Sequence, residues 1–219
     1  MLKEANRVLP NCRLRVRIFA GEEWMVKTIK AAFGFLFASL LAGCCNPANI
    51  GSVPVTLNGQ LQTNWCWAAS GQMTMNYLHS ASNVQQCDEA NKEFGRSDCC
   101  NASVPSACNN GGWPEYGKYS FTADTTSDAP LTWAQIQSQI YCAKKPFAFS
   151  WHWNSGGGHM MVATGYVTIG GTNYVSVNNP WPPTGGVQEI YTYDKYVGGS
   201  GWDHSHWNDY YNITYTGGQ

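Results

Sequence analysis

A cysteine that could do chemistry stands at position 66, between two tryptophans and ahead of small residues, in the stretch TNWCWAAS. Residues 66–79 predict a helix, because most of them are tolerable or good helix formers and no proline interrupts them. The partial positive charge at a helix start favours a thiolate, which is the nucleophilic form of cysteine. Cys66 is therefore a candidate nucleophile; the competing interpretations are a buried structural thiol and one half of a disulfide.

A nucleophilic thiolate needs a base, and His159 is the best placed of the five histidines. It follows three glycines at positions 156–158 and opens an apolar stretch that predicts a strand. The glycines leave the imidazole uncovered and let a substrate backbone approach. His152 alternates with tryptophans, which indicates a strand surface, and His79 would lie at the far end of the helix from the thiol.

The base in turn needs an orienting side chain, and the strand end VSVNNPWPP offers two asparagines. Side chains alternate along a strand, so only one of them should face the histidine. We choose Asn179, with Asn178 as the alternative. The oxyanion that forms on attack needs hydrogen-bond donors. Gln60, six residues before the cysteine, and the backbone N–H of the cysteine are the candidates, with Gln62 as the competitor to Gln60.

Two kinds of periodicity indicate the elements that position these residues. Large or small apolar residues recur every four positions from 65 to 77, as a core-facing helix stripe does. A second helix is predicted over 133–141, opened by a capping box of Thr132 and Gln135. Residues 80–130 are rich in Cys, Asn, Gly and Ser and indicate loops. Strands with a period of two are predicted over 147–153, 159–169, 173–179 and 187–196. Helices first and strands later favour an α+β fold, with a helical N-terminal half, an antiparallel β-rich C-terminal half and a cleft between them.

The order of the candidate residues resembles that of the papain-like cysteine proteases. That family has Gln, Cys-Trp-Ala, Gly-His and Asn-x-Trp in this chain order, and the sequence matches with Gln60, Cys66, His159 and Asn179. The resemblance implies a papain-like two-part fold with the nucleophile at a helix N-terminus. It also implies peptide-bond hydrolysis through a Cys-His-Asn triad without a cofactor, and it makes Trp181 the residue that shields the bond between histidine and asparagine from water.

A second stretch, CCNASVPSACNNGGWP, is similar to the papain-family segment whose glycine backbone pairs with the substrate. This similarity implies that Gly111 and Gly112 line the cleft. The stretches NWCWAASGQM, GGGHMMVATGY and NPWPP look closest to the bacterial avirulence-effector branch, and the resemblance covers about residues 53–215. There are two departures. Thr63 stands where papain has a disulfide-bonded cysteine, so Cys108 needs another partner, and many relatives in the bacterial branch carry aspartate as the orienting residue.

The amino-terminal region is predicted to be a targeting segment. Residues 25–43 show a positive head, a short apolar stretch and small residues, which is the order of a secretory signal peptide. The ending LAGC resembles the bacterial lipoprotein box, which implies a lipid on Cys44. Cys45 as the second mature residue implies sorting to the outer membrane of the bacterial cell envelope. The expected boundaries are an extra leader or mis-assigned start (1–24, with Met25 as the true start), a lipoprotein signal peptide (25–43), a tether (44–52) and a protease domain (53–219).

Export places the other cysteines where disulfides persist. Cys12 precedes the signal, Cys44 is expected to be lipidated and Cys66 to be nucleophilic. Two disulfides are expected among the five remaining cysteines of the domain, with one thiol left over. The adjacent Cys99 and Cys100 should not pair with each other, because a bridge between neighbours is strained. The set of five is Cys87, Cys99, Cys100, Cys108 and Cys142.

Metal binding and nucleic-acid binding are both disfavoured. The gaps of eleven, zero and seven residues between the clustered cysteines do not match the paired spacing of zinc ligands. His204 and His206 could bind metal, but an aromatic-rich strand near the C-terminus explains them better. The chain after residue 43 is mildly acidic and has no basic stripe with interleaved aromatic residues, so no nucleic-acid partner is expected.

These observations together predict an exported cysteine peptidase that acts as a monomer on a protein or peptide and is held at a membrane by its lipid anchor. One alternative is a transpeptidase or amide transferase that uses the same triad. The other is a surface binding module that keeps a protease fold without turnover.

Overall fold

The computed structural model describes residues 45–218. The described residues from 46 onward form one compact unit. The predicted signal peptide and the predicted lipid site at Cys44 lie outside the described residues. Within residues 45–218, no helix is long and apolar enough to cross a membrane.

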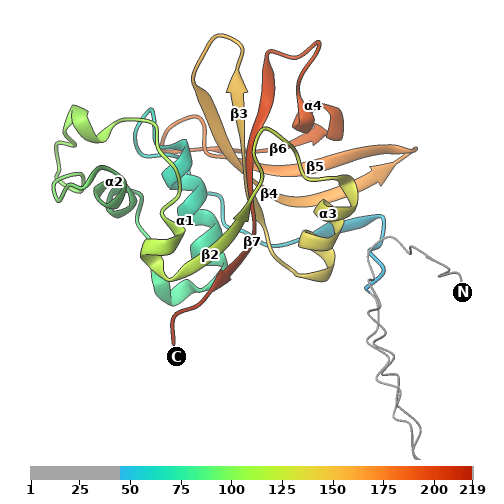
Figure 1. Cartoon of the computed structure of the whole chain (residues 1–219), viewed down its shortest axis with the longest axis horizontal. Helices are drawn as coiled ribbons and strands as arrows, with labels where there is room; N and C mark the ends of the chain where they lie inside the picture. The colour runs from blue at the N-terminus through green and yellow to red at the C-terminus, as the bar shows by residue number, and fades with distance from the viewer. Residues whose placement is uncertain (1–44, 219) are drawn as a thin grey trace, which may run out of the picture. The chain divides into compact units, whose positions relative to one another are not determined.

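One antiparallel sheet is the frame of the protein (Figure 1). Its strands lie in the order β2-β7-β3-β4-β5-β6, and β1 pairs with β4. The three strands predicted over 147–153, 159–169 and 173–179 are confirmed almost to the residue. The bounds are β1 Ile50–Ser52, β2 Phe121–Thr125, β3 Phe147–Trp153, β4 Gly158–Ile169, β5 Thr172–Asn179, β6 Val187–Thr192 and β7 His204–Tyr215.

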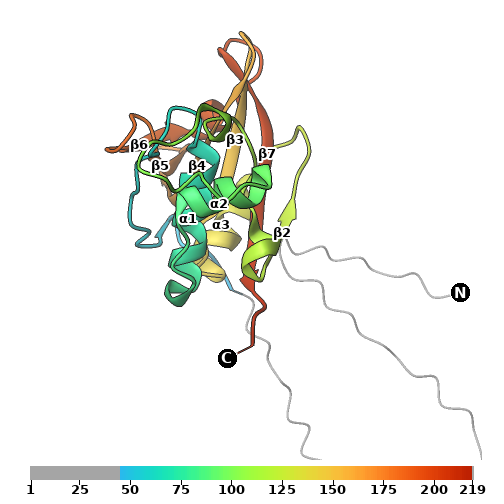
Figure 2. The ribbon, with the colours of Figure 1, turned by 90° about the vertical axis from the view of Figure 1, so that its left-hand side faces the viewer.

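The two longer helices lie together beside the strands, and the view turned by 90° shows them in front of the sheet (Figures 1 and 2). They are α1 (Cys66–Leu78) and α2 (Gln86–Phe94). Two short helices, α3 (Trp133–Gln137) and α4 (Tyr193–Val197), accompany the other half of the sheet. The helical first half and the antiparallel second half are the predicted α+β arrangement. The predicted capping box of Thr132 and Gln135 also opens α3.

Small residues let α1 pack closely on its neighbours. Ala68, Ala69 and Gly71 are buried within the helix, and α1 packs against β4, β7 and β3. A side chain added at Gly71 would collide with the carboxylate of Glu89 in α2, so glycine there lets the two helices approach. Burial of Met73 on the same helix contributes about 1.5–3 kcal/mol to stability.

An apolar cluster ties the start of α1 to the start of β4. Trp65 and Trp67, on either side of Cys66, are both about 1% exposed and share this cluster with Met160 of β4. The disulfide-bonded Cys99 and Cys108 belong to the same cluster. The segment that carries Cys66 and the segment that follows His159 are therefore packed against each other.

The stretch 80–130 is more regular than predicted. It contains α2, β2 and short 3₁₀ turns at Ser80–Ser82, Ser106–Cys108 and Tyr116–Tyr119. The buried residues of α2 are Gln86, Glu89 and Ala90, so no apolar period marks the helix in the sequence. Gly95 ends it in the left-handed conformation at φ 62°.

Two predicted boundaries differ as well. The expected tether is partly strand, because residues 50–52 pair with residues 165–167 of β4; backbone pairing of this kind needs no apolar pattern. The strand predicted over 187–196 ends at Thr192, whose hydroxyl accepts the N–H of Lys195 at 3.2 Å and starts α4.

Two disulfides form within the predicted set, Cys87–Cys100 and Cys99–Cys108. The adjacent Cys99 and Cys100 each pair elsewhere, as expected. The expectation of one leftover thiol is wrong, because Cys142 is also disulfide-bonded.

Candidate active site

Cys66 is the first residue of α1, and it is the free cysteine of the described part of the chain. Trp65 at the N-cap provides no side-chain acceptor, so the N–H groups of the first turn stay available. Burial raises the pKa of the Cys66 thiol, and the backbone N–H groups of Met160, Trp67 and Cys66 oppose that effect. The contact with Met160 places the sulfur beside the start of β4, where His159 lies.

His159 and Asn179 are hydrogen-bonded, with 2.7 Å between Nε2 and Oδ1. Asn178 pairs with Val162 in the β4–β5 register, so the next residue, Asn179, lies diagonally across from His159 on the same face. Asn178 points to the other face and donates to the carbonyl of Val55 at 3.1 Å. The structure therefore places Asn179, and not the alternative Asn178, against the histidine.

The hydrogen bond also defines the tautomer of the imidazole. An amide oxygen only accepts, so Nε2 of His159 carries the proton in this bond. Nδ1 is then the nitrogen left to take a proton from a nucleophile. Burial lowers the pKa of His159, while the bond to Asn179 and the charge of Glu189 raise it.

Gln60 lies where the sequence predicted, but its amide is occupied. The side chain is 1% exposed and lines the same cavity as Cys66. Its Nε2 donates to the carbonyls of Gln62 and Thr63, at 2.8 and 2.7 Å. Gln60 would have to release one of these carbonyls to donate to an oxyanion. The competitor Gln62 contributes its backbone carbonyl to this arrangement.

A loop at residues 108–112 lies against the N-terminus of α1. Trp65 Nε1 donates to the carbonyl of Cys108 at 2.7 Å, and Trp67 Nε1 donates to that of Asn110 at 3.1 Å. Asn109 donates to Thr63 Oγ1 at 2.9 Å. Hydrogen bonds therefore anchor the loop at Thr63, the position of the missing cysteine, while Cys108 pairs with Cys99.

Two cavities flank Cys66. The larger is about 680 Å³ and is lined by Gln60, Cys66, His159, Asn179 and the half-exposed Trp181. The backbone N–H of Trp181 donates to Asn179 Oδ1 at 3.0 Å. The wall of this cavity beyond the histidine consists of Trp151, Trp153, Met161, Tyr191, Lys195 and Asp203.

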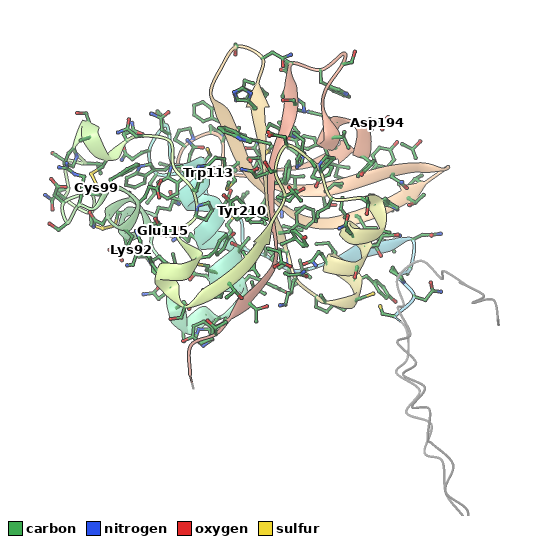
Figure 3. All side chains as sticks on the ribbon, in the orientation of Figure 1. Lys92, Cys99, Trp113, Glu115, Asp194 and Tyr210 are labelled. Atoms are coloured by element: carbon green, nitrogen blue, oxygen red, sulfur yellow. A yellow bond between two sulfur atoms is a disulfide. The ribbon has the colours of Figure 1, made fainter. Side chains whose placement is uncertain are left out.

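The second cavity is about 360 Å³ and also reaches Cys66 and His159. Gly111 and Gly112 both line it, as predicted. Three indoles and one acid complete much of its wall: Trp67, Trp113, Trp207 and Glu93. Figure 3 shows Trp113 between the helical side and the strands. Burial and then a hydrogen bond with Glu115 raise the pKa of Glu93.

The sequence reasoning missed the groups behind Asn179. Asn179 Nδ2 donates to Glu189 Oε2 at 2.6 Å, and the hydroxyl of Tyr191 donates to the same oxygen. Both residues are on β6 and face the same side of the sheet as Val177 and Asn179. The alternation in VQEIYTY could have indicated these two residues, because it places Glu189 and Tyr191 on the same face of the strand, and the register puts that face on the side of Asn179.

The groups considered for metal binding are engaged otherwise. The ring nitrogens of the buried His204 and His206 all face carbonyl or carboxylate oxygens at 2.8–3.0 Å. Two groups of cysteine and aspartate side chains lie close together among residues 45–218. In both groups the cysteines are joined to each other as disulfides, and a disulfide lacks the thiolate that binds a metal.

The fold and the placement of these side chains define a papain-like α+β protein. A solved chain reported for the mite allergens Blo t 1 and Der p 1 is similar in fold, at 11% identity and a TM-score of 0.50, over 78% of this chain and 73% of that one. The digestive procathepsin L 3 of Tenebrio molitor matches at 10% identity and a TM-score of 0.46, over 77% and 71%. No curated protein matches. The sequence pattern of the Peptidase_C39-like family matches residues 53–213, and the chain belongs to that family.

Proposed function

We propose that this protein is a cysteine peptidase in which Cys66 attacks a peptide carbonyl. The observation that carries the proposal is the 2.7 Å bond between His159 and Asn179 inside a cavity that Cys66 also lines. Membership of a peptidase-like family supports hydrolysis as the class of reaction. The roles of the individual residues rest on the geometry.

The reaction follows from the hydrogen bonds of the site. Nδ1 of His159 takes the proton of the Cys66 thiol, and the sulfur forms a bond to the carbonyl carbon. The backbone N–H of Cys66 and the amide of Gln60 donate to the oxyanion, for which Gln60 releases one carbonyl. The imidazolium then protonates the leaving amine as the C–N bond breaks. Water, deprotonated by the same imidazole, hydrolyses the thioester and restores the thiol.

The substrate is a protein or peptide, and the second cavity favours an apolar side chain next to the cut. Its walls include Trp67, Trp113 and Trp207, which offer a large apolar surface. The backbone of Gly111 lies in the open cleft, where an added side chain would meet nothing within 4 Å. An extended substrate could therefore pair with that backbone.

The location of the enzyme is part of the same proposal. Residues 25–43 are predicted to be a lipoprotein signal peptide, so we propose a lipid on Cys44 and a place in the bacterial cell envelope, at the outer membrane. We also propose that the protein is related to the bacterial avirulence-effector branch and that it is a monomer. The disulfides Cys87–Cys100 and Cys99–Cys108 are consistent with export.

The rate of alkylation of Cys66 against pH tests the proposal. The full chain, with its disulfides intact, is treated with iodoacetamide, and peptide mapping assigns the label. His159→Ala is the matched variant, and Cys66→Ala gives the background. An ordinary thiol titrates near 8.5. We expect labelling of the wild type to persist at least about two pH units below that ordinary value and to be lost in the histidine variant.

Labelling that rises only near the ordinary thiol pKa, with no effect of His159→Ala, would refute the proposal and favour the binding module. A positive result is followed by digestion of a peptide library with mass spectrometry. Products that gain water indicate hydrolysis, whereas products that gain an added amine indicate the amide transferase.

A further inference from the structure

A partly buried carboxylate lies directly behind the asparagine of the proposed centre. Glu189 Oε2 accepts Asn179 Nδ2 at 2.6 Å and also the hydroxyl of Tyr191. Asn179 Oδ1 accepts His159 Nε2 at 2.7 Å. One hydrogen-bonded chain therefore runs from the imidazole to a carboxylate across three neighbouring strands of the sheet, β4, β5 and β6.

We infer that Glu189 is a positioning residue of this centre: it holds the Asn179 amide with its oxygen toward His159 and places a negative charge behind the imidazole. The inference rests on the proposed function, since it assigns a task to a residue that touches neither Cys66 nor the substrate.

The orientation of the Asn179 amide follows from its three contacts. Oδ1 faces two donors, His159 Nε2 and the N–H of Trp181, and Nδ2 faces the acceptor Glu189. A flipped amide would turn its NH₂ toward the Trp181 N–H and its oxygen toward the carboxylate, so both contacts would become repulsive. The flipped amide would also favour the other tautomer of His159, with its proton toward Cys66, where no base would remain for the thiol.

The carboxylate is itself held in place. Tyr191 is 5% exposed, and burial followed by the bond to Glu189 raises its pKa, so its hydroxyl remains a donor. The β5–β6 register sets Glu189 opposite Val177, on the face that carries Asn179. A charge fixed in this way interacts with the imidazolium without reorganisation when the proton moves.

Two other charged side chains, Lys195 and Asp203, line the same cavity as His159. Cys66 of α1 lines this cavity as well. Burial lowers the pKa of His159, and the bond to Asn179 and the charge of Glu189 oppose that effect. On α4, Lys195 Nζ lies 4.0 Å from the ring centroid of Tyr191. Asp203 lies on the wall of the same cavity, and its hydrogen bond with His204, followed by the charge of Lys195, lowers its pKa.

Exchange of the acid and the amide gives the sharpest test. Asn179→Asp alone sets two carboxylates side by side, so that one must take up a proton. The double change Asn179→Asp with Glu189→Gln keeps one negative charge and an acceptor for His159, and it reverses the direction of the hydrogen bond between residues 179 and 189. In that variant the new carboxylate accepts from His159, while the new amide donates to this carboxylate.

Alkylation of Cys66 against pH is measured for the full chain and for four variants, with thermal unfolding as a check of the fold. Glu189→Gln removes the charge and keeps an acceptor, and Asp194→Asn is the control. Asp194 is an exposed acid on α4 (Figure 3). The negative charge of Glu189, one residue beyond Asn179 in the hydrogen-bonded chain, should change the protonation equilibrium of His159 by roughly a factor of ten. We expect labelling at neutral pH about ten-fold slower for Glu189→Gln, and wild-type behaviour for Asp194→Asn.

The single change Asn179→Asp should also label at least about ten-fold more slowly, and the double change should return to within about three-fold of the wild type. A purely structural role predicts that the two single effects multiply in the double variant. That result, or wild-type labelling by Glu189→Gln, overturns the inference. If His159→Ala labels at the same rate as the wild-type protein, the proposed function is overturned, and this inference falls with it.

Discussion

The disulfide Cys99–Cys108 should contribute to activity as well as to stability, because Cys108 begins the loop that lines the cleft. Removing it by Cys99→Ala with Cys108→Ala opens a ring whose ends are nine residues apart. The chain-entropy relation gives about 3 kcal/mol for a ring of this size. In a domain of this length that loss lowers the melting temperature by roughly 6–12 °C.

The second disulfide provides the matched control. Cys87 and Cys100 are 13 residues apart, so the same relation again gives about 3 kcal/mol. This bridge joins α2 to the segment that follows it, and neither cysteine lines either cavity. The two double variants should therefore lose similar stability but differ in KM for the substrate.

Differential scanning calorimetry and steady-state hydrolysis separate these effects. Both variants should melt at similarly lowered temperatures. The variant without Cys99–Cys108 should show KM raised at least about five-fold at a temperature where it is fully folded, because the backbone of Gly111 is no longer fixed beside Cys66. Equal KM values in the two variants would refute the reasoning and show that the hydrogen bonds from Trp65 and Trp67 suffice to hold the loop.

Three further changes test other parts of the structure. Burial raises the pKa of Glu89 well above its ordinary value, so the native protein keeps a proton that the unfolded protein releases. The free energy of unfolding therefore falls as pH rises from about 4.5. Glu89→Gln should reduce this fall, which urea unfolding at pH 5 and pH 8 will measure. Asn109→Ala removes the bonds to Thr63 and Asn64 and should cost about 1–2 kcal/mol in urea unfolding; an unchanged midpoint would mean that these bonds do not anchor the loop. Gln60→Ala should lower kcat about 100-fold with KM nearly unchanged. A kcat within about three-fold of wild type would mean that Gln60 only holds its own loop through the bonds to Gln62 and Thr63.

Much of the fold could be predicted because its elements carry local signals. The capping box at Thr132 and the alternation in β3, β4 and β5 are short-range features that the structure preserves. By contrast, α2 buries Gln86 and Glu89, and those polar residues are stabilised only by partners from other segments. Gln86, for instance, bonds to the backbone of Leu61 and Gly59. A helix of that kind leaves no periodic signature.

The candidate site shows the same division. Residue types and chain order were enough to select Cys66, His159 and Asn179, because the chemistry restricts which side chains can serve. Strand alternation alone could not decide between Asn178 and Asn179, since that choice depends on the register of β5 against β4. The occupied amide of Gln60 was equally out of reach, because its acceptors are carbonyls that only the folded loop brings together.

The anchoring of the cleft loop shows what a resemblance can and cannot carry over. The papain-like pattern places a covalent bridge between the nucleophile segment and the glycine loop, and this chain has Thr63 at that position. The structure keeps the contact but changes its chemistry: Asn109 bonds to Thr63 and Trp65 bonds to the carbonyl of Cys108. The covalent bond instead ties Cys108 outward to Cys99, which Figure 3 shows at the outer end of the helical side. The position of the loop beside the nucleophile therefore depends on hydrogen bonds worth about 1 kcal/mol each as well as on the disulfide to Cys99, so single changes among these few side chains should alter substrate binding before they unfold the domain.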